Sequence, residues 1–443
     1  MELLTAYLEK LNGFIWGVPM ITILVGTHIY LTIKLKFIQK YTFKAIKLSV
    51  RPDKSKGTIS GFGALAVSTA AAIGTGNIIG VATAISSGGS GAIFWMLFSS
   101  VLGISTKYAE SLLAVVYREH RESGEYVGGP MYVLEKGLKK KWLAVIFAIG
   151  TLLSAFMMGN MVQSNSITDL MKSAYSVQPW ISGIVLTSIV AFVIIGGIQS
   201  ITRACEYILP LMGLIYILAG LVIIGLNYVH IPNVLIDIFK NAFTFKAAAG
   251  GAIGITIKEA LRYGISRGLF SNESGLGSAA IASAAAKTHS SVKQGLIMST
   301  SVFWDTIVVC STTALIILTA GDLNSGLFGA DLVHNAFNTI GNIGPLILTV
   351  SLIFFCFTTL IGWCYFGEKV IEYLEGHKSI KIYRWLFIST VMIGSTLSAK
   401  LVWQLADTAL IFMAIPNIIG VLMLRKVIFK ETDKYLKQEL KDV

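Results

Sequence analysis

The stretch Ala71-Ala-Ile-Gly-Thr-Gly-Asn-Ile-Ile-Gly80 places three glycines, a threonine and an asparagine inside a long apolar run. Glycine weakens a helix, and a buried asparagine needs polar partners. This composition predicts that a hydrophobic helix is interrupted at Gly74 to Asn77, and an interruption in such a place needs a functional reason.

The composition indicates an integral membrane protein. Hydrophobic residues make up 54% of the 443 residues and charged residues only 14%, against about 25% charged residues in soluble domains. Apolar stretches long enough to cross a bilayer as helices recur along the chain. No cleavable signal is predicted, because the first residues include Glu2 and Glu9 and lack a basic region. We read eleven spans, at 13–35, 58–86, 90–117, 142–171, 179–198, 202–226, 247–286, 291–320, 343–370, 382–399 and 402–425.

The net charge of +12 is distributed unevenly along the chain. Lys and Arg concentrate between the first and second spans, after the third span and after the last, whereas the loop 321–342 contains neither. Basic loops normally stay in the cytoplasm. We therefore expect the N-terminus outside and the C-terminus in the cytoplasm, and we expect the basic residues to orient the chain rather than to bind nucleic acid.

A second motif, Gly268-Leu-Phe-Ser-Asn-Glu-Ser-Gly-Leu-Gly277, interrupts the seventh span. The two motifs lie five spans apart in segments of opposite direction. Paired glycine-broken helices of this kind are typical of transporters built from inverted repeats. We predict one transmembrane domain over 1–443, with repeats at 58–226 and 247–425. An extra N-terminal helix and a cytoplasmic loop occupy 1–57, and a basic cytoplasmic tail occupies 426–443.

An interruption of a membrane helix exposes main-chain groups of both polarities. Amides around Thr75 to Asn77 would favour a carboxylate, and carbonyls at Ala70 to Ile73 would favour a cation such as Na⁺. A zwitterion could therefore bind beside a metal ion. Gly76 to Gly80 is also a GxxxG motif, which ordinarily serves close helix packing. The polar residues Asn77, Asn272 and Glu273 within the two motifs favour a binding site.

Five ordered blocks of this sequence resemble the alanine or glycine:cation symporters, prokaryotic amino-acid carriers with the leucine-transporter (LeuT) fold. The resemblance implies an all-α membrane protein with two inverted repeats of five spans and one extra N-terminal helix. It also implies import of a small neutral amino acid, alanine or glycine first, coupled to Na⁺ across a prokaryotic plasma membrane. Ser90, Leu97, Ala280 and Ser283 depart from the family pattern, so glutamine or serine remains an alternative substrate. Coupling to H⁺ is a separate alternative. The blocks are Gly74–Ala84, Gly88–Met96, Tyr126–Tyr132, Arg267–Ser278 and Asp305–Cys310.

The resemblance also implies the position of the ion. In carriers of this fold a hydroxyl pair on a second helix completes the sodium site, and the ninth span has Thr358 and Thr359 there. We expect Na⁺ to bind these hydroxyls together with the carbonyls of Ala70, Ile73 and Phe355. A membrane threonine usually bonds its own backbone instead, and that alternative stays open.

The substrate is expected to lie against both breaks. The resemblance places Gln163 beside it, although Gln163 could merely bond a neighbouring helix. Trp363 lies one turn beyond Thr359 and would wall the pocket, unless it is an interfacial belt residue. The complete expected substrate set is Gly74, Thr75, Gly76, Asn77, Gln163, Phe270, Ser271, Thr359 and Trp363.

Other charges within the predicted spans are less specific. Lys258, Glu259 and Arg262 have the spacing for pairing along one helix and suggest a vestibule or structural network. Asp305 and Glu110 are candidates for gating or proton handling. The segment Ile231 to Phe245 is predicted to lie along the outer membrane surface.

Two other classes of protein fit less well. A channel filter is normally repeated around a symmetric pore, whereas the two motifs differ in sequence. An enzyme would need a nucleophile with a base or a metal pair, and the sequence has no HExxH or CxxC spacing. The four cysteines lie in apolar segments and are expected to be buried thiols. We expect a non-enzymatic monomer in a lipid bilayer whose partners are Na⁺ and an amino acid.

Overall fold

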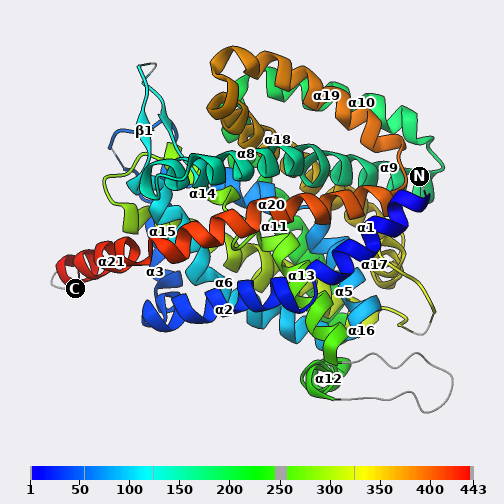
Figure 1. Cartoon of the computed structure of the whole chain (residues 1–443). Helices are drawn as coiled ribbons and strands as arrows, with labels where there is room; N and C mark the ends of the chain where they lie inside the picture. The colour runs from blue at the N-terminus through cyan, green and yellow to red at the C-terminus, as the bar shows by residue number, and fades with distance from the viewer. Residues whose placement is uncertain (1, 54, 123, 245–256, 324, 440–443) are drawn as a thin grey trace.

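The computed structural model describes residues 2–53, 55–122, 124–244, 257–323 and 325–439 and is mostly helical (Figure 1). The described residues contain one antiparallel hairpin, formed by β1 (Glu119–His120) and β2 (Tyr126–Val127). The N- and C-termini lie at opposite ends of the molecule (Figure 1).

Most helices of the first half follow the predicted spans, with additional helices before the first span and in the loops after the first and third spans. In order they are α1 (Glu2–Ile15), α2 (Val18–Lys34), α3 (Thr42–Ser49), α4 (Gly61–Ala72), α5 (Val81–Gly88), α6 (Gly91–Val116), α7 (Pro130–Tyr132), α8 (Lys141–Phe156), α9 (Val162–Tyr175), α10 (Pro179–Ile195), α11 (Gly197–Leu226) and α12 (Ile231–Phe243). Short π-helical or 3₁₀ turns join several of them: η1 (Ile38–Tyr41), η2 (Gly76–Gly80), η3 (Val133–Gly137), η4 (Met157–Met161) and η5 (Tyr228–His230).

The second half continues in the same way. Its helices are α13 (Ile257–Asn272), α14 (Ser278–Ala285), α15 (Ser291–Val302), α16 (Ser311–Ala320), α17 (Ala330–Phe337), α18 (Ile343–Glu375), α19 (Ile380–Thr396), α20 (Ala399–Met423) and α21 (Arg425–Glu439). Its short turns are η6 (Phe303–Cys310), η7 (Asn338–Ile340) and η8 (His377–Ser379).

Among the described residues, six continuous helices are long and apolar enough to cross a membrane, and two bent helix pairs would raise the number to eight. The bent pairs are α1 with α2, at 42°, and α4 with the helix that resumes at Gly76, at 53°. Of the other predicted spans, the fifth and tenth correspond to the 17-residue helices α10 and α19. The predicted start of the seventh, at 247, lies outside the described residues.

Helix α13 packs closely against α6 because glycines face the contact. A Cβ on Gly264 would lie 2.3 Å from the carbonyl oxygen of Ala92, and a Cβ on Gly268 would lie 3.2 Å from Cγ of Met96. Gly268 therefore serves helix packing. The prediction that the second interruption begins at Gly268 is wrong, since α13 continues to Asn272 and the break covers Glu273 to Gly277.

The second break has a backbone that few residues adopt. Glu273, Gly275 and Gly277 all have positive φ, at 57°, 95° and 78°, a region that glycine tolerates best. This conformation ends α13 and allows α14 to begin in another direction. Glu110 of α6 and Arg118, which lies just after α6, support the resulting half-helix at its two ends.

The two supports of α14 carry opposite charges. The Glu110 carboxylate faces the backbone amides of Gly275 and Gly277 at its N-terminal side. Arg118 donates hydrogen bonds to the carbonyls of Ala284, Ala286 and Thr288 at its C-terminal side, at 3.3, 2.8 and 3.0 Å. Each charge has the sign that the helix dipole favours.

Helix α12 is the predicted surface segment, and it packs against α6. Trp95 Nε1 donates to the carbonyl of Ala242 at 3.1 Å, and Asn241 donates to Ser90 Oγ at 2.9 Å. Away from this contact, Leu235 and Ile236 are exposed. The helix therefore has one attached face and one apolar exposed face.

Candidate ion and substrate site

The first break is short and sharply defined. Helix α4 ends at Ala72, Ile73 has extended backbone angles of −74° and 97°, and the chain resumes helical form as the π-helical turn η2. The carbonyls at the end of α4 therefore have no continuing helix to bond. Thr75, Asn77 and their neighbours are buried within the bundle.

Thr359 of α18 lies directly against the free carbonyls of this break. Its hydroxyl oxygen is 3.1 Å from the carbonyl oxygens of both Ala70 and Ile73 and 3.0 Å from that of Phe355. A hydroxyl has one proton and can donate it to only one of these three acceptors. The remaining carbonyl oxygens form an electron-rich pocket of the kind that hard cations bind.

Thr358 is adjacent but differently bonded. Its hydroxyl donates to the carbonyl of Phe355 in its own helix at 3.1 Å, which is the ordinary behaviour of a membrane threonine. The carbonyl oxygen of Phe355 also lies 3.0 Å from the Thr359 hydroxyl, so the Thr358 hydroxyl still lies beside the oxygen cluster. The structure thus brings together four of the five expected sodium ligands and leaves Thr358 at the edge.

The amides of the first break have side-chain partners. The amide of Gly74 donates to Asn77 Oδ1 at 2.9 Å, and the amide of Thr75 donates to Gln163 Oε1 at 3.1 Å. The Thr75 hydroxyl also donates to Gln163 Oε1, at 2.8 Å, and lies 3.2 Å from Cys356 Sγ. We expected the amides around Thr75 to Asn77 to face a substrate carboxylate. The Thr75 amide instead bonds Gln163 Oε1, and the Asn77 amide donates to the carbonyl of Gly74 at 3.2 Å.

Gly74 has no room for a side chain. A Cβ at this position would lie 2.5 Å from Thr359 Oγ1 and 2.8 Å from Gln163 Oε1. The absence of a side chain at Gly74 therefore permits the close approach of α18 on one side and of α9 on the other. The candidate ion site and the Gln163 contact are direct neighbours.

Asp305 of η6 joins the two broken helices. It accepts hydrogen bonds from Asn77 Nδ2 at 2.7 Å and from Ser271 Oγ at 2.8 Å. Thr306 donates a third, at 2.7 Å. This buried carboxylate places a negative charge at the meeting point of the two breaks, where the sequence suggested only a general role.

Phe270 lies on the side predicted to face outside. Its ring stacks on Trp403 of α20 at 4.7 Å between centroids, and a Cβ on Gly76 would lie 3.1 Å from the Phe270 ring. Arg267 lies over Trp403 and pairs with Asp407 at 3.1 Å. Beyond this cover, a cavity of about 790 Å³ includes Arg267 and Trp403 in its lining.

Trp363 is buried between three elements. Its side chain packs where Gly159 of η4 leaves no room for a Cβ, and its Nε1 donates to Glu273 Oε1 at 3.0 Å. An interfacial belt position is therefore wrong for this residue. Trp363 links α18, which carries Thr359, to the second break.

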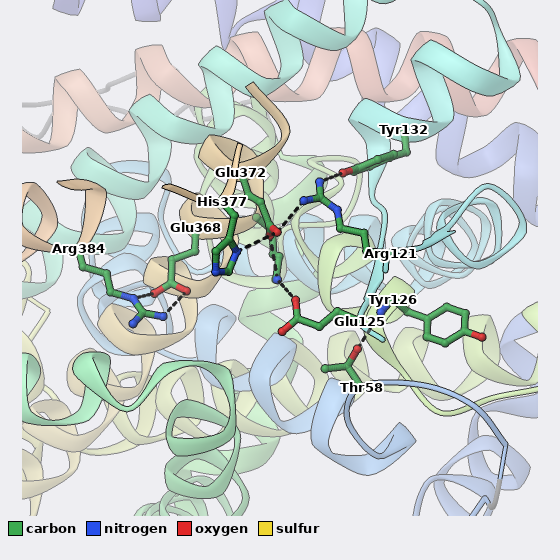
Figure 2. A network of polar contacts seen from close by, with 10 residues as sticks. Thr58, Arg121, Glu125, Tyr126, Tyr132, Glu368, Glu372, His377 and Arg384 are labelled. Carbon is green, nitrogen blue, oxygen red and sulfur yellow. Dashed lines mark hydrogen bonds and ion pairs between the residues drawn. The ribbon is translucent and has the colours of Figure 1, made fainter. Parts of the chain in front are cut away.

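A network of charged residues lies at the end of the molecule predicted to face the cytoplasm (Figure 2). Glu372 of α18 pairs with Arg121 at 2.8 Å and with Lys369 at 3.0 Å, and Lys369 also pairs with Glu125 at 3.0 Å. Burial favours the neutral form of Arg121, but its hydrogen bond with Tyr132 and the charges of Glu372 and Glu125 outweigh it and raise the pKa of Arg121. The network ties the β1–β2 loop to α18.

Sequence reasoning missed several residues that the structure brings to this region. Trp403 and Asp407 come from the eleventh predicted span, which carried no motif. Lys107 is fully buried in α6, and its position three residues before Glu110 was the available signal. The Lys258, Glu259 and Arg262 group lies at the start of α13, and its role remains a prediction.

The chain matches the model of the sodium:alanine symporter family over residues 1–443. It is 47% identical over 439 residues to the sodium/alanine symporter AgcS of Methanococcus maripaludis, covering 96% of each chain. It is 38% identical over 434 residues to the probable sodium/glutamine symporter GlnT of Bacillus subtilis, covering 97% of this chain and 90% of that protein.

The fold is also similar to that of a solved structure. The structure of MhsT in complex with L-phenylalanine aligns with a TM-score of 0.61 at 13% identity, over 83% of this chain and 89% of that one. At this identity the likeness shows the leucine-transporter type of fold and nothing further. The relatives are transporters rather than enzymes. With its whole length matched, this chain belongs to the sodium:alanine symporter family.

Proposed function

We propose that this protein is a secondary symporter that imports a small neutral amino acid, alanine or glycine first, together with Na⁺. The observation that carries the proposal is the Thr359 hydroxyl, which lies within 3.1 Å of three carbonyl oxygens and can satisfy only one. A cation at this point would use the remaining oxygens. The proposed ligands are Ala70, Ile73, Phe355, Thr358 and Thr359.

The substrate is proposed to bind between the breaks as a zwitterion. Its carboxylate would take the place of Gln163 Oε1 at the amide of Thr75, beside Gly74, Gly76 and Asn77. Its ammonium group would face Asp305 and Ser271, which supply negative charge and a hydroxyl. Phe270 would cover the bound molecule, and Thr359 and Trp363 would hold α18 against it.

The two ends of the molecule support alternating access. On one side, the Phe270–Trp403 stack and the Arg267–Asp407 pair separate the site from the large cavity. On the other, the Glu372 network joins α18 to the hairpin loop (Figure 2). Rocking of one group of helices against the other would open these closures in turn.

The proposed architecture has eleven spans, with repeats at 58–226 and 247–425, an extra N-terminal region at 1–57 and a tail at 426–443. The positions of the two breaks, five spans apart, support it. We further propose a monomer in a prokaryotic plasma membrane, with the N-terminus outside and the C-terminus in the cytoplasm. The N- and C-termini lie at opposite ends of the molecule, which is compatible with an odd number of membrane crossings (Figure 1).

Counterflow in proteoliposomes tests the function. Vesicles preloaded with unlabelled amino acid should accumulate labelled alanine or glycine in NaCl and fail to do so in choline chloride. Scanning glutamine and serine in the same vesicles tests the alternative substrates, and replacing Na⁺ by a pH gradient tests coupling to H⁺. Uptake that never saturates with substrate would instead indicate a channel.

A further inference from the structure

The second break lies in a buried cluster of charges that the proposed sodium site does not use. Helix α6 carries Lys107 and Glu110 one turn apart, and Glu273 and Asp305 come from the break and from η6. All four side chains are at most 2% exposed. One ammonium group thus lies among three carboxylates.

Lys107 is not hydrogen-bonded within this cluster. Its Nζ has no hydrogen-bond partner and forms no ion pair within 4.0 Å in the part of the chain that the structure describes. Its charge nevertheless acts on Glu110, Glu273 and Asp305. A buried ammonium group without direct partners is costly, so its charge has to be balanced by the carboxylates nearby.

The three carboxylates differ in what holds them. Glu110 accepts a hydrogen bond from Asn417 at 2.8 Å and faces two backbone amides at the start of α14, but its Oε1 has no hydrogen-bond partner among the described residues. Asp305 accepts from Asn77, Ser271 and Thr306. Among the described residues, Glu273 accepts hydrogen bonds from the neutral side chains of Trp363 and Ser278.

The neighbouring elements add two further titratable groups among the described residues, His28 and Cys310, and Cys310 Sγ lies 3.3 Å from Ser271 Oγ. His28 of α2 is bonded through Nδ1 to Thr106, the residue before Lys107, at 2.7 Å. Helices α14 and α20 contribute Ser278 and Asn417, which are uncharged. The excess of carboxylates over the single lysine therefore has no other cation among these contacts to balance it.

We propose that Glu273 is a proton-binding site that is coupled to the sodium site through Trp363. Glu273 binds one proton from water to become a carboxylic acid and releases it to become a carboxylate that the nearby charge of Lys107 stabilises. The proposal rests on the proposed symport. It assigns the first break to Na⁺ and substrate and the second to a proton.

The link to the first break is short. Trp363 lies one turn beyond Thr359 on α18 and donates to Glu273 Oε1 at 3.0 Å. Binding of Na⁺ adds a positive charge near this path and should favour release of the proton. By thermodynamic linkage, the apparent affinity for Na⁺ must then rise as the pH rises.

The test measures protons directly on the purified chain in detergent. NaCl, or choline chloride as a control, is added in weak buffer with a pH indicator, and apparent Na⁺ affinity is measured from pH 5.5 to 8.5. The wild type should release up to about one proton per chain on adding Na⁺. Glu273→Gln keeps an acceptor for Trp363 and should release none, and its Na⁺ affinity should not vary with pH.

Two further variants define the outcome. Lys107→Met removes the balancing charge and should move the pH midpoint upward by about one unit or more. Glu122→Gln, an exposed carboxamide substitution in the hairpin loop, should behave as wild type. Proton release and pH dependence unchanged in Glu273→Gln, or an unmoved midpoint in Lys107→Met, would overturn the proposal. Proton release without any amino-acid transport would overturn the proposed substrate and leave this site standing.

Discussion

The hydroxyl oxygen of Thr359 lies 3.1 Å from the carbonyl oxygen of Ile73, the residue at which the first broken helix stops. Two segments separated by most of the chain thereby share one oxygen cluster. The contact exists because Gly74 has no side chain and Ile73 is extended rather than helical. A cation bound here would hold the first break in one backbone conformation. That conformation determines where the neighbouring backbone amides point.

Gly74→Ala should impair both binding events at once. The new methyl group would press on Thr359 Oγ1 and Gln163 Oε1, at 2.5 and 2.8 Å. Overpacking of this kind costs roughly 1–3 kcal/mol, so alanine uptake and Na⁺ affinity should each fall by roughly ten-fold or more. Transport assays at varied Na⁺ measure both.

Gly213→Ala is the matched control for that change. A Cβ at Gly213 of α11 meets no atom within 4 Å, so uptake should equal that of the wild type. Equal loss in both variants would mean that the membrane helices merely resist any added methyl group. Normal uptake by Gly74→Ala would remove Gly74 from the site.

Gln163→Glu should weaken alanine binding without weakening Na⁺ binding. The new carboxylate keeps the shape of glutamine and its acceptor for Thr75, but it places negative charge where the substrate carboxylate is proposed to bind. Two negative charges placed next to each other in a buried site repel strongly. Alanine affinity should fall by at least about ten-fold, while Na⁺ affinity should hold or improve. A parallel fall in both would indicate general damage rather than a substrate contact.

Glu372→Gln should loosen the cytoplasmic closure. The change removes the charge that holds Arg121 and Lys369 together. Cys356, buried beside Thr75, reports the opening in a chain whose other three cysteines are replaced. Labelling of Cys356 by a membrane-impermeant thiol reagent from the cytoplasmic side should become about ten-fold faster.

Removing a charge at the other end controls for that experiment. Glu9→Gln breaks an exposed ion pair with Lys400 and should not change the labelling rate, since exposed pairs contribute little. Identical labelling in wild type and Glu372→Gln would show that the network does not close the path.

The sequence was informative for features that depend on the residues of a single segment. Gly74 to Asn77 predicted a break because glycines and a buried asparagine conflict with a lipid-facing helix, and the carbonyls of Ala70 and Ile73 follow from that break. The buried thiols were also confirmed, since all four cysteines are free and buried. The family resemblance located Thr359 on the partner helix.

Contacts between distant segments were not readable in the same way. Gly268 looked like part of a break because glycine serves both close packing and sharp turns, and only the position of Met96 decides between them. Trp363 points to Glu273 because Gly159 fixes its side chain from a third helix. The amide partners of Gly74 and Thr75 likewise depend on where two side chains come to lie.

The central claim, that the first break binds Na⁺ and thereby the substrate, is tested most directly by equilibrium binding of labelled alanine to the purified protein at varied Na⁺. Wild-type protein should bind alanine in NaCl and not in choline chloride. Thr359→Ala should need roughly ten-fold more Na⁺ for half-maximal binding, and Thr358→Ala should need a smaller increase. Thr151→Ala, which removes a buried hydroxyl bonded only within its own helix, should match the wild type. Equally tight alanine binding without Na⁺, or an unchanged Na⁺ requirement in Thr359→Ala, would contradict the account.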